Sequence, residues 1–148
     1  MEFYNFRLRG GELQSLIPVF LALALFLGVL PCQAGDVPRL DADKVLVLMA
    51  YSNSCKKWCK EVKPRLGKVE EKYGDKVVVH MVNVSKEHFD GSMEKAKQLG
   101  IPGFLVEVRD WVPCVAVFTR DRKLIKELTG AKNLETYCKF IDKALKKG

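Results

Sequence analysis

The sequence lacks an apolar run long enough to span a membrane, and it contains no internal repeat, no low-complexity tract and only two histidines. Its longest apolar run, Leu16–Leu30, has 15 residues, whereas a membrane-spanning helix needs about 20. This length disfavours a membrane-spanning protein. The lack of repeats excludes a solenoid, whose core is built from stacked repeats. The scarcity of histidine excludes a metal site made mainly of imidazoles.

The first 34 residues have the three parts of a secretory signal. Arg7 and Arg9 give a weakly basic start, the apolar run follows, and Cys32-Gln-Ala34 ends in a small residue before Gly35. We expect residues 1–34 to direct export to the periplasm or the extracellular space and then to be removed. The alternative is that this segment is retained and anchors the protein at the membrane.

The remaining 114 residues have the length of one compact domain with its own core. We divide them into a short polar lead-in, residues 35–43, and a domain, residues 44–148. The net charge of +7 falls entirely in this part, and we interpret it as lysines on solvated helix faces. A nucleic acid would suit the charge but not an exported protein, so we expect no nucleic-acid partner. Weak attraction to an anionic membrane surface stays open.

Apolar patterns predict alternating strands and helices. Lys44–Tyr51 and Lys76–Val84 are apolar enough for two buried parallel strands. Between them, apolar residues recur at helical spacing from Cys55 to Tyr73. A strand, a helix and a parallel strand form a right-handed crossover. The other predicted elements are a short helix, a hairpin and a final helix: Ser92–Leu99, Cys114–Thr119 with Leu124–Leu128, and Asn133–Lys147.

These elements give the order βαβαββα and the α/β class. Residues 101–112 are the hardest segment to place. Phe104, Val106 and Val108 alternate with other residue types there. This alternation predicts either an extra strand or an ordered loop.

Cys55 and Cys59 carry the clearest chemistry in the chain. They follow the first predicted strand and open the predicted helix, where unpaired backbone N–H groups and the positive end of the helix dipole favour a thiolate. Lys56 and Lys57 add positive charge beside them. The Cys-x-x-x-Cys spacing places the two sulfurs about one helical turn apart on one face. A disulfide between them is feasible, although the spacing does not require it.

Cys114 and Cys138 fall on apolar faces of predicted elements. In an exported protein, two further cysteines could form a second disulfide. We interpret them instead as small buried hydrophobic residues, because a chain of this size folds without such a crosslink.

The order of elements, with two cysteines after the first strand, resembles the core of the thioredoxin family over residues 44–147. Further segments carry the resemblance: a proline five residues after the second cysteine (Cys59 to Pro64), a helix end and the following strand (Tyr73–Val84), a proline before a strand (Val112–Phe118), and a glycine turn before the last helix (Thr129–Ala131). The resemblance implies a thioredoxin-like α/β fold, with a mixed sheet flanked by helices.

The resemblance also implies roles for the two cysteines. Cys55 would be the exposed nucleophile that attacks a substrate disulfide, and Cys59 would resolve the mixed disulfide that results. No metal and no cofactor is expected for this chemistry.

A substrate groove is implied by the same resemblance. Pro113 would follow a cis peptide bond, and Val112 before it would face the cysteines and line the groove. Pro102 is the rival for the cis proline. We add Trp58 to the expected groove residues, because it lies inside the cysteine motif.

The sequence departs from the family pattern in four respects. One residue is added within the cysteine motif or in the turn before it. The family's buried acid aligns with Leu48 or Met49, and the accompanying lysine with Met81, so apolar side chains replace an ionic pair. The family's first strand and helix are missing. Residues 102–111 form an insertion without a counterpart.

Together these inferences predict an exported thiol–disulfide oxidoreductase that acts on protein disulfides. We expect a monomer that works with a redox-recycling partner. Whether it reduces, oxidises or isomerises stays open, because the residues between the cysteines carry no familiar code for either direction.

Two other functions remain as alternatives. A copper(I) chaperone could use Cys55 and Cys59 with His88 as a third ligand, although a solvated loop position is the simpler interpretation of His88. We interpret His80 as a core histidine. A non-catalytic module could instead hold an extended peptide, with Trp58 and Trp111 in contact with it.

Overall fold

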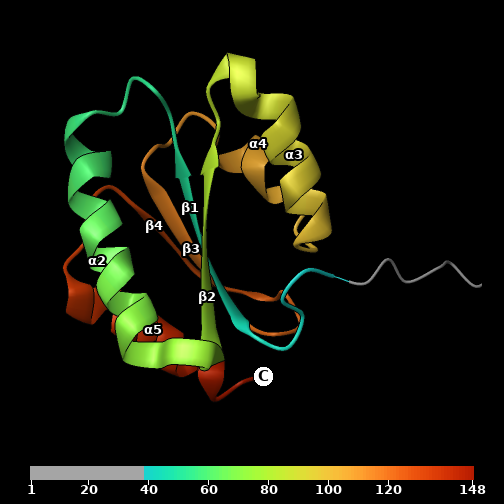
Figure 1. The fold of residues 1–148 in the computed structure, drawn as a ribbon, viewed down its shortest axis with the longest axis vertical. Coiled ribbons are helices and arrows are strands. Elements are labelled where there is room, and N and C mark those ends of the chain that lie inside the picture. Colours follow the sequence, from blue (N-terminus) through green and yellow to red (C-terminus); the bar gives the residue numbers. More distant parts are fainter. Residues whose placement is uncertain (1–38) are drawn as a thin grey trace, which may run out of the picture. The chain divides into compact units, whose positions relative to one another are not determined.

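The computed structural model describes residues 39–148, which form a four-stranded mixed sheet with helices on both faces (Figure 1). The predicted signal, residues 1–34, and the first part of the lead-in lie outside the described residues. Within residues 39–148, no helix is long and apolar enough to cross a membrane.

The order of elements follows the predicted βαβαββα pattern, with one short helix added before the third strand. The strands and helices are β1 (Val45–Tyr51), α2 (Lys57–Tyr73), β2 (Val77–Asn83), α3 (Phe89–Gln98), α4 (Phe104–Val108), β3 (Cys114–Phe118), β4 (Leu124–Thr129) and α5 (Leu134–Leu145). Two single 3₁₀ turns, η1 (Gly74–Lys76) and η2 (Lys86–His88), precede β2 and α3 respectively.

The strands lie in the order β2-β1-β3-β4. β1 runs parallel to β2 and antiparallel to β3, and β3 forms an antiparallel hairpin with β4. Tyr51 at the end of β1 lies opposite Asn83 at the end of β2, and Ala50 lies opposite Cys114 at the start of β3. The ends of β1 and β2 and the start of β3 therefore meet at one edge of the sheet.

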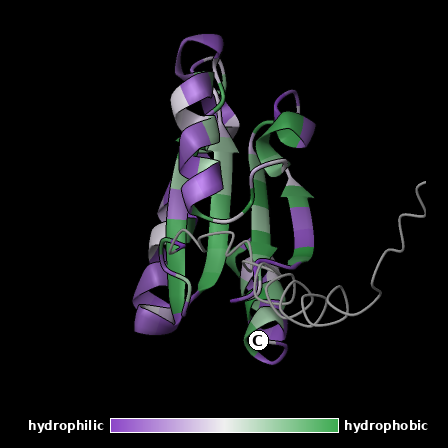
Figure 2. Ribbon diagram, turned by 90° about the vertical axis from the view of Figure 1, so that its right-hand side faces the viewer, coloured by the Kyte–Doolittle hydropathy of each residue, from purple (hydrophilic) through white to green (hydrophobic). Residues whose placement is uncertain are grey.

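β1 is the centre of the core, because the side chains of Val45–Ala50 are fully buried. Alternate residues point to opposite faces of a strand, so β1 contributes to two clusters. Val45, Val47 and Met49 pack with residues of α2 and α5. Leu46, Leu48 and Ala50 pack with residues of α3 and α4. The strands are largely hydrophobic in colour, whereas the longer helices carry much of the hydrophilic colour (Figure 2). The short helix α4 is an exception, because four of its five residues are hydrophobic.

Two predictions about buried segments are corrected by the structure. β2 was predicted to be buried, but in the described chain it pairs only with β1, and Met81 is 40% exposed. Residues 104–108 form the helix α4 instead of a strand or loop. The alternation of Phe104 and Val108 is also a one-turn helical spacing, and both side chains are buried against the sheet while Val106 points outward.

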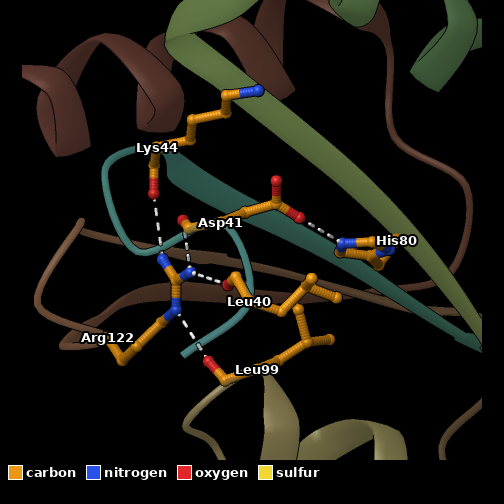
Figure 3. A network of polar contacts seen from close by, with 6 residues as sticks. All are labelled: Leu40, Asp41, Lys44, His80, Leu99 and Arg122. Atoms are coloured by element: carbon orange, nitrogen blue, oxygen red, sulfur yellow. Dashed lines mark hydrogen bonds and ion pairs between the residues drawn. The ribbon is translucent and has the colours of Figure 1, made fainter. Parts of the chain in front are cut away.

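Arg122, in the turn between β3 and β4, fastens the end of the lead-in to the domain (Figure 3). Its side chain is 8% exposed, and its backbone has a left-handed φ of 64°. The guanidinium donates hydrogen bonds of 2.7–2.9 Å to four backbone carbonyls, and a longer one of 3.4 Å to Arg120. The four close acceptors belong to Leu40, Asp41, Lys44 and Leu99.

His80 is not the core histidine that the sequence suggested. Its side chain is 20% exposed on the edge strand β2. The ring Nε2 lies 3.0 Å from a carboxylate oxygen of Asp41 in the lead-in (Figure 3). A lead-in that covers an edge strand explains this placement, because it supplies a polar partner to a half-buried ring.

Candidate functional site

Cys55 and Cys59 form a disulfide whose Cα atoms are 5.7 Å apart, a separation in the usual range for disulfides. Cys55 lies in the turn between β1 and α2, and Cys59 lies in the first turn of α2. Cys55 is half-buried, whereas Cys59 is 4% exposed and belongs to the core. The two sulfurs therefore differ in their access to a partner molecule.

The predicted helix started at Cys55, but α2 starts at Lys57. Cys55 belongs instead to a tight turn, in which its backbone N–H donates to the carbonyl of Ser52 over 3.1 Å. Cys55 still packs against the core that α2 and β1 share. Its four-residue spacing from Cys59 therefore fits the apolar stripe without Cys55 being helical.

A polar network holds this turn against the loop that follows β2. The backbone N–H of Asn53 donates to Ser85 Oγ over 2.8 Å. The Asn53 side-chain amide donates to Glu87 over 2.6 Å and accepts from the amide of Asn83 over 2.9 Å. The loop after β2 thus fixes the backbone immediately before Cys55.

This network was not predicted from the sequence, although a signal for it existed. Asn53 follows β1, Asn83 is the last residue of β2, and Ser85 follows β2. Polar residues after two neighbouring parallel strands meet at one sheet edge. The pKa of Glu87 is held below its ordinary value, mainly by a hydrogen bond from its own backbone N–H; desolvation opposes this shift, and the Asn53 amide adds to it. Glu87 is therefore a carboxylate at neutral pH.

A hollow of about 290 Å³ opens beside the disulfide. Its lining combines both cysteines, the preceding turn and one face of α2: Tyr51, Ser52, Asn53, Cys55, Lys56, Cys59, Lys60 and Lys63. No acidic residue lines it, and the first turn of α2 contains none. Lys63 Nζ lies over the ring of Tyr51, 4.4 Å from its centre. The surface beside the disulfide is therefore positively charged.

The floor beneath Cys59 is apolar. Cys59 shares a core cluster with Met49, Val62 and Leu66. Among residues 39–148, no acid and no histidine is buried. Met49 lies opposite Met81 in the β1–β2 register. Met49 is one of the two positions that the resemblance aligned with the family's acid, and it is thus a neighbour of Met81, which the resemblance aligned with the lysine. Both carry thioethers, whereas Leu48, the other candidate, lies opposite His80.

The Val112–Pro113 peptide bond is cis, as predicted, and Pro102 is not preceded by a cis bond. Cys114 lies opposite Ala50, so Pro113 precedes β3 at the edge where β1 ends and the Cys55 turn begins. The backbone N–H of Gly130 donates to the Pro113 carbonyl over 2.8 Å. This bond ties the proline loop to the end of β4.

Comparisons with known proteins identify the fold. No family model and no curated protein matches the chain. Among solved structures, the chain is similar to a putative thiol:disulfide interchange protein DsbE from Chlorobium tepidum, with a TM-score of 0.54 and 20% identity, over 71% of this chain and 82% of that one. The fold is thioredoxin-like. At this level of identity the likeness shows the fold alone, and it confirms the predicted fold class.

A second solved structure, described as that of a malarial protein, has a TM-score of 0.49 and 15% identity. It covers 69% of this chain and 98% of its own. A TM-score this low supports no inference about fold or function.

The predicted groove residues of this thioredoxin-like fold differ in exposure. Trp58 is 51% exposed, with Lys57 Nζ 5.3 Å from a ring centre, and Trp111 is 64% exposed. Val112 is partly buried against the α3 and α4 cluster, and it does not line the hollow beside the disulfide. A substrate groove over Val112 and Pro113 stays a prediction.

The other two cysteines are buried, and His88 is exposed. Cys114 and Cys138 are free and buried, as the sequence analysis interpreted them. Burial, with the nearby Glu127 carboxylate, raises the pKa of Cys114 to about 12. His88 is exposed in η2. Among residues 39–148, no three His, Cys, Asp or Glu side chains are grouped so that they could hold a metal ion.

Proposed function

We propose that the protein is an exported thiol–disulfide oxidoreductase that exchanges the Cys55–Cys59 disulfide with thiols and disulfides of other proteins. The observation that supports this proposal most directly is a disulfide between a half-exposed and a buried cysteine at the edge of a thioredoxin-like sheet. A solved structure of the same fold is titled as a putative thiol:disulfide interchange protein. Export rests on the signal-like sequence of residues 1–34.

In the reducing direction, the Cys55 thiolate attacks one sulfur of a substrate disulfide. The substrate S–S bond breaks, one substrate sulfur leaves as a thiolate that takes up a proton, and a Cys55–substrate disulfide forms. Cys59 then loses its proton and attacks the Cys55 sulfur, which releases the second substrate thiol. The substrate gains two electrons and two protons, and the Cys55–Cys59 disulfide re-forms. Oxidation of a substrate dithiol is the reverse sequence.

The environment of each cysteine supports this division of roles. Cys55 is the more exposed of the two, and it lies beside the N-terminus of α2 and Lys56, both of which favour a negative sulfur. Cys59 packs on one side against apolar side chains, which cannot accept its proton, and on the other side it lines the hollow, whose lining contains no carboxylate. In our proposal, this proton leaves through the hollow beside the disulfide, to water.

Single-cysteine variants test the proposal. Cys59→Ser and Cys55→Ser are made in the full chain with Cys32 replaced by alanine, so that only thiols of the described residues react. After reduction, each variant is mixed with bis(2-hydroxyethyl) disulfide, and the adduct is followed by intact mass. We expect Cys59→Ser to accumulate a one-to-one mixed disulfide and Cys55→Ser to form it at least about tenfold more slowly. Equal rates for the two variants would contradict the assigned roles.

A further inference from the structure

We propose that this site prefers substrate disulfides flanked by acidic residues. This inference rests on the proposed exchange through Cys55 and Cys59, and it adds the charge class of the polypeptide that docks there. The surface in question is the hollow beside the disulfide and the adjoining first turns of α2. We call this surface the lysine rim and define it by Lys56, Lys57, Lys60 and Lys63.

The lysine rim brings four ammonium groups to within two turns of one helix. Lys56, Lys60 and Lys63 line the hollow together with both cysteines. Lys57 is adjacent in the chain and covers the exposed ring of Trp58. A polypeptide that reaches Cys55 through the hollow therefore meets this positive surface, and it meets no carboxylate in the lining.

The charge of the rim is not neutralised from within the described chain. Among residues 39–148, no ion pair involves any of its four lysines. Two acids close to the rim, one in the chain and one through the turn before Cys55, have other partners. Glu61 pairs with Arg65 over 3.5 Å, and Glu87 accepts a hydrogen bond from the side-chain amide of Asn53.

The stability of α2 does not explain why these lysines lie at its N-terminal end. The N-terminus of a helix is its positive end, and acidic side chains stabilise it whereas basic ones oppose it. Lys56 is the N-cap of α2, yet its side chain makes no capping hydrogen bond, and the first turn contains no acid. By contrast, Lys143 in the last turn of α5 lies where the dipole favours a cation. Lys56, Lys57 and Lys60 lie at the N-terminal end of α2, where a cation weakens the helix. Their charge can favour the Cys55 thiolate and can also bind an acidic ligand that approaches it.

An acidic segment is the occupant that this chemistry fits. Carboxylates that flank a disulfide would pair with the rim ammonium groups while the disulfide approaches Cys55. Attraction of this kind raises association rates by about tenfold or more at low ionic strength and weakens as salt screens the charges. A basic segment would be repelled by the same surface.

Three synthetic peptides test the inference on the reduced full-length protein. They share one disulfide-closed loop and differ only in the residues that flank their cysteines, which are Glu, Gln or Lys. Reduction of each peptide is timed by acid quenching and mass spectrometry in about 20 mM and about 500 mM salt. We expect the Glu peptide to react at least about tenfold faster than the Lys peptide at low salt, with the ratio falling severalfold at high salt.

Matched lysine variants locate the effect. The double variant Lys60→Gln and Lys63→Gln should lower the Glu-to-Lys rate ratio at least about threefold. The control, Lys143→Gln and Lys146→Gln, removes the same charge from the end of α5 and should leave the ratio unchanged. Equal rates for the three peptides, or an equal effect of both double variants, overturn the inference and leave the exchange function standing. If the reduced protein does not reduce the Gln peptide and the oxidised protein does not oxidise its dithiol form, the proposed function fails and this inference fails with it.

Discussion

At the scale of single residues, the four cysteines of the described chain fall into two environments. Cys55 and Cys59 are bonded to each other at the edge of the sheet, whereas Cys114 and Cys138 are free and buried. Sequence pattern alone anticipated this division, because the first two follow a strand end and the other two fall on apolar faces. It could not establish that the first pair is bonded, since Cys-x-x-x-Cys spacing permits a disulfide without requiring one.

Cys114 should be unreactive in the native protein. A thiol with a pKa of about 12 stays protonated at pH 8, and its side chain is fully buried. In reduced protein at pH 8, iodoacetamide should modify Cys114 at least about a hundredfold more slowly than Cys55, as measured by peptide mapping. In urea the two rates should converge. Comparable rates for Cys114 and Cys55 in the folded protein would show that the Cys114 thiol is not buried.

Asn53 should stabilise the turn before Cys55. Asn53→Ala removes its side-chain bonds to Glu87 and Asn83 and should lower the free energy of unfolding by about 1 kcal/mol in urea titrations. Ser54→Ala is the matched control, because the Ser54 side chain bonds only to Ser52 among the described residues. It should cost less than about 0.5 kcal/mol. Equal losses would mean that the network does not stabilise the fold.

The Asn53 effect should depend on pH in one direction. The pKa of Glu87 is lower in the folded protein than its ordinary value of 4.5. The stability that this carboxylate contributes is therefore present above pH 4.5 and is lost as the pH falls through its folded value. The difference between wild type and Asn53→Ala should narrow below pH 4.5. A difference that is constant down to pH 3 would contradict the role of Glu87.

At the scale of elements, the apolar pattern predicted most helices and strands but misread two segments. β1 was recognisable as an uninterrupted apolar run, and α2 by apolar residues at helical spacing. Residues 104–108 were not, because Phe104 and Val108 fit both an alternating strand and one turn of helix. The burial of β2 was overestimated because valine-rich sequence looks the same at the edge of a sheet as at its centre. Only the neighbouring strands decide which applies.

The start of α2 shows a second limit of prediction from the spacing of apolar residues. Cys55 has the right spacing for the apolar stripe, yet it belongs to the turn closed by its hydrogen bond to Ser52. Such a bond depends on backbone geometry, which periodicity does not report. The chemistry predicted for Cys55 is unaffected, because it still lies beside the helix N-terminus.

At the scale of the whole molecule, Arg122 joins segments that are far apart in the sequence. One guanidinium binds carbonyls of the lead-in, of the residue before β1 and of the residue after α3. From the sequence alone, Arg122 is predicted only to lie in the turn of the hairpin between the last two strands. A charged turn residue is normally solvated, and nothing in the chain indicates that its partners are carbonyls 78 to 82 residues away.

Arg122→Lys should destabilise the fold while keeping its charge and its backbone conformation. A lysine cannot reach the separated carbonyls that the guanidinium fork binds, so the buried carbonyl of Leu99 or the part-buried carbonyls of Leu40, Asp41 and Lys44 are left without donors. We expect a loss of about 2–4 kcal/mol in the free energy of unfolding, measured in urea. Arg120→Lys, on the same turn but exposed, should change it by less than about 0.5 kcal/mol. A similar small effect for Arg122→Lys would contradict the fastening role.

The most direct test of the account is a redox titration of the purified protein. The protein is equilibrated in glutathione buffers of graded potential, free thiols are alkylated, and the products are measured by intact mass and peptide mapping. We predict a reversible two-electron step that maps to Cys55 and Cys59, with a midpoint between about −300 and −100 mV, while Cys114 and Cys138 do not form a second pair. If Cys55 and Cys59 stay alkylatable under oxidising conditions, or the disulfide resists every reducing buffer, the oxidoreductase account is wrong.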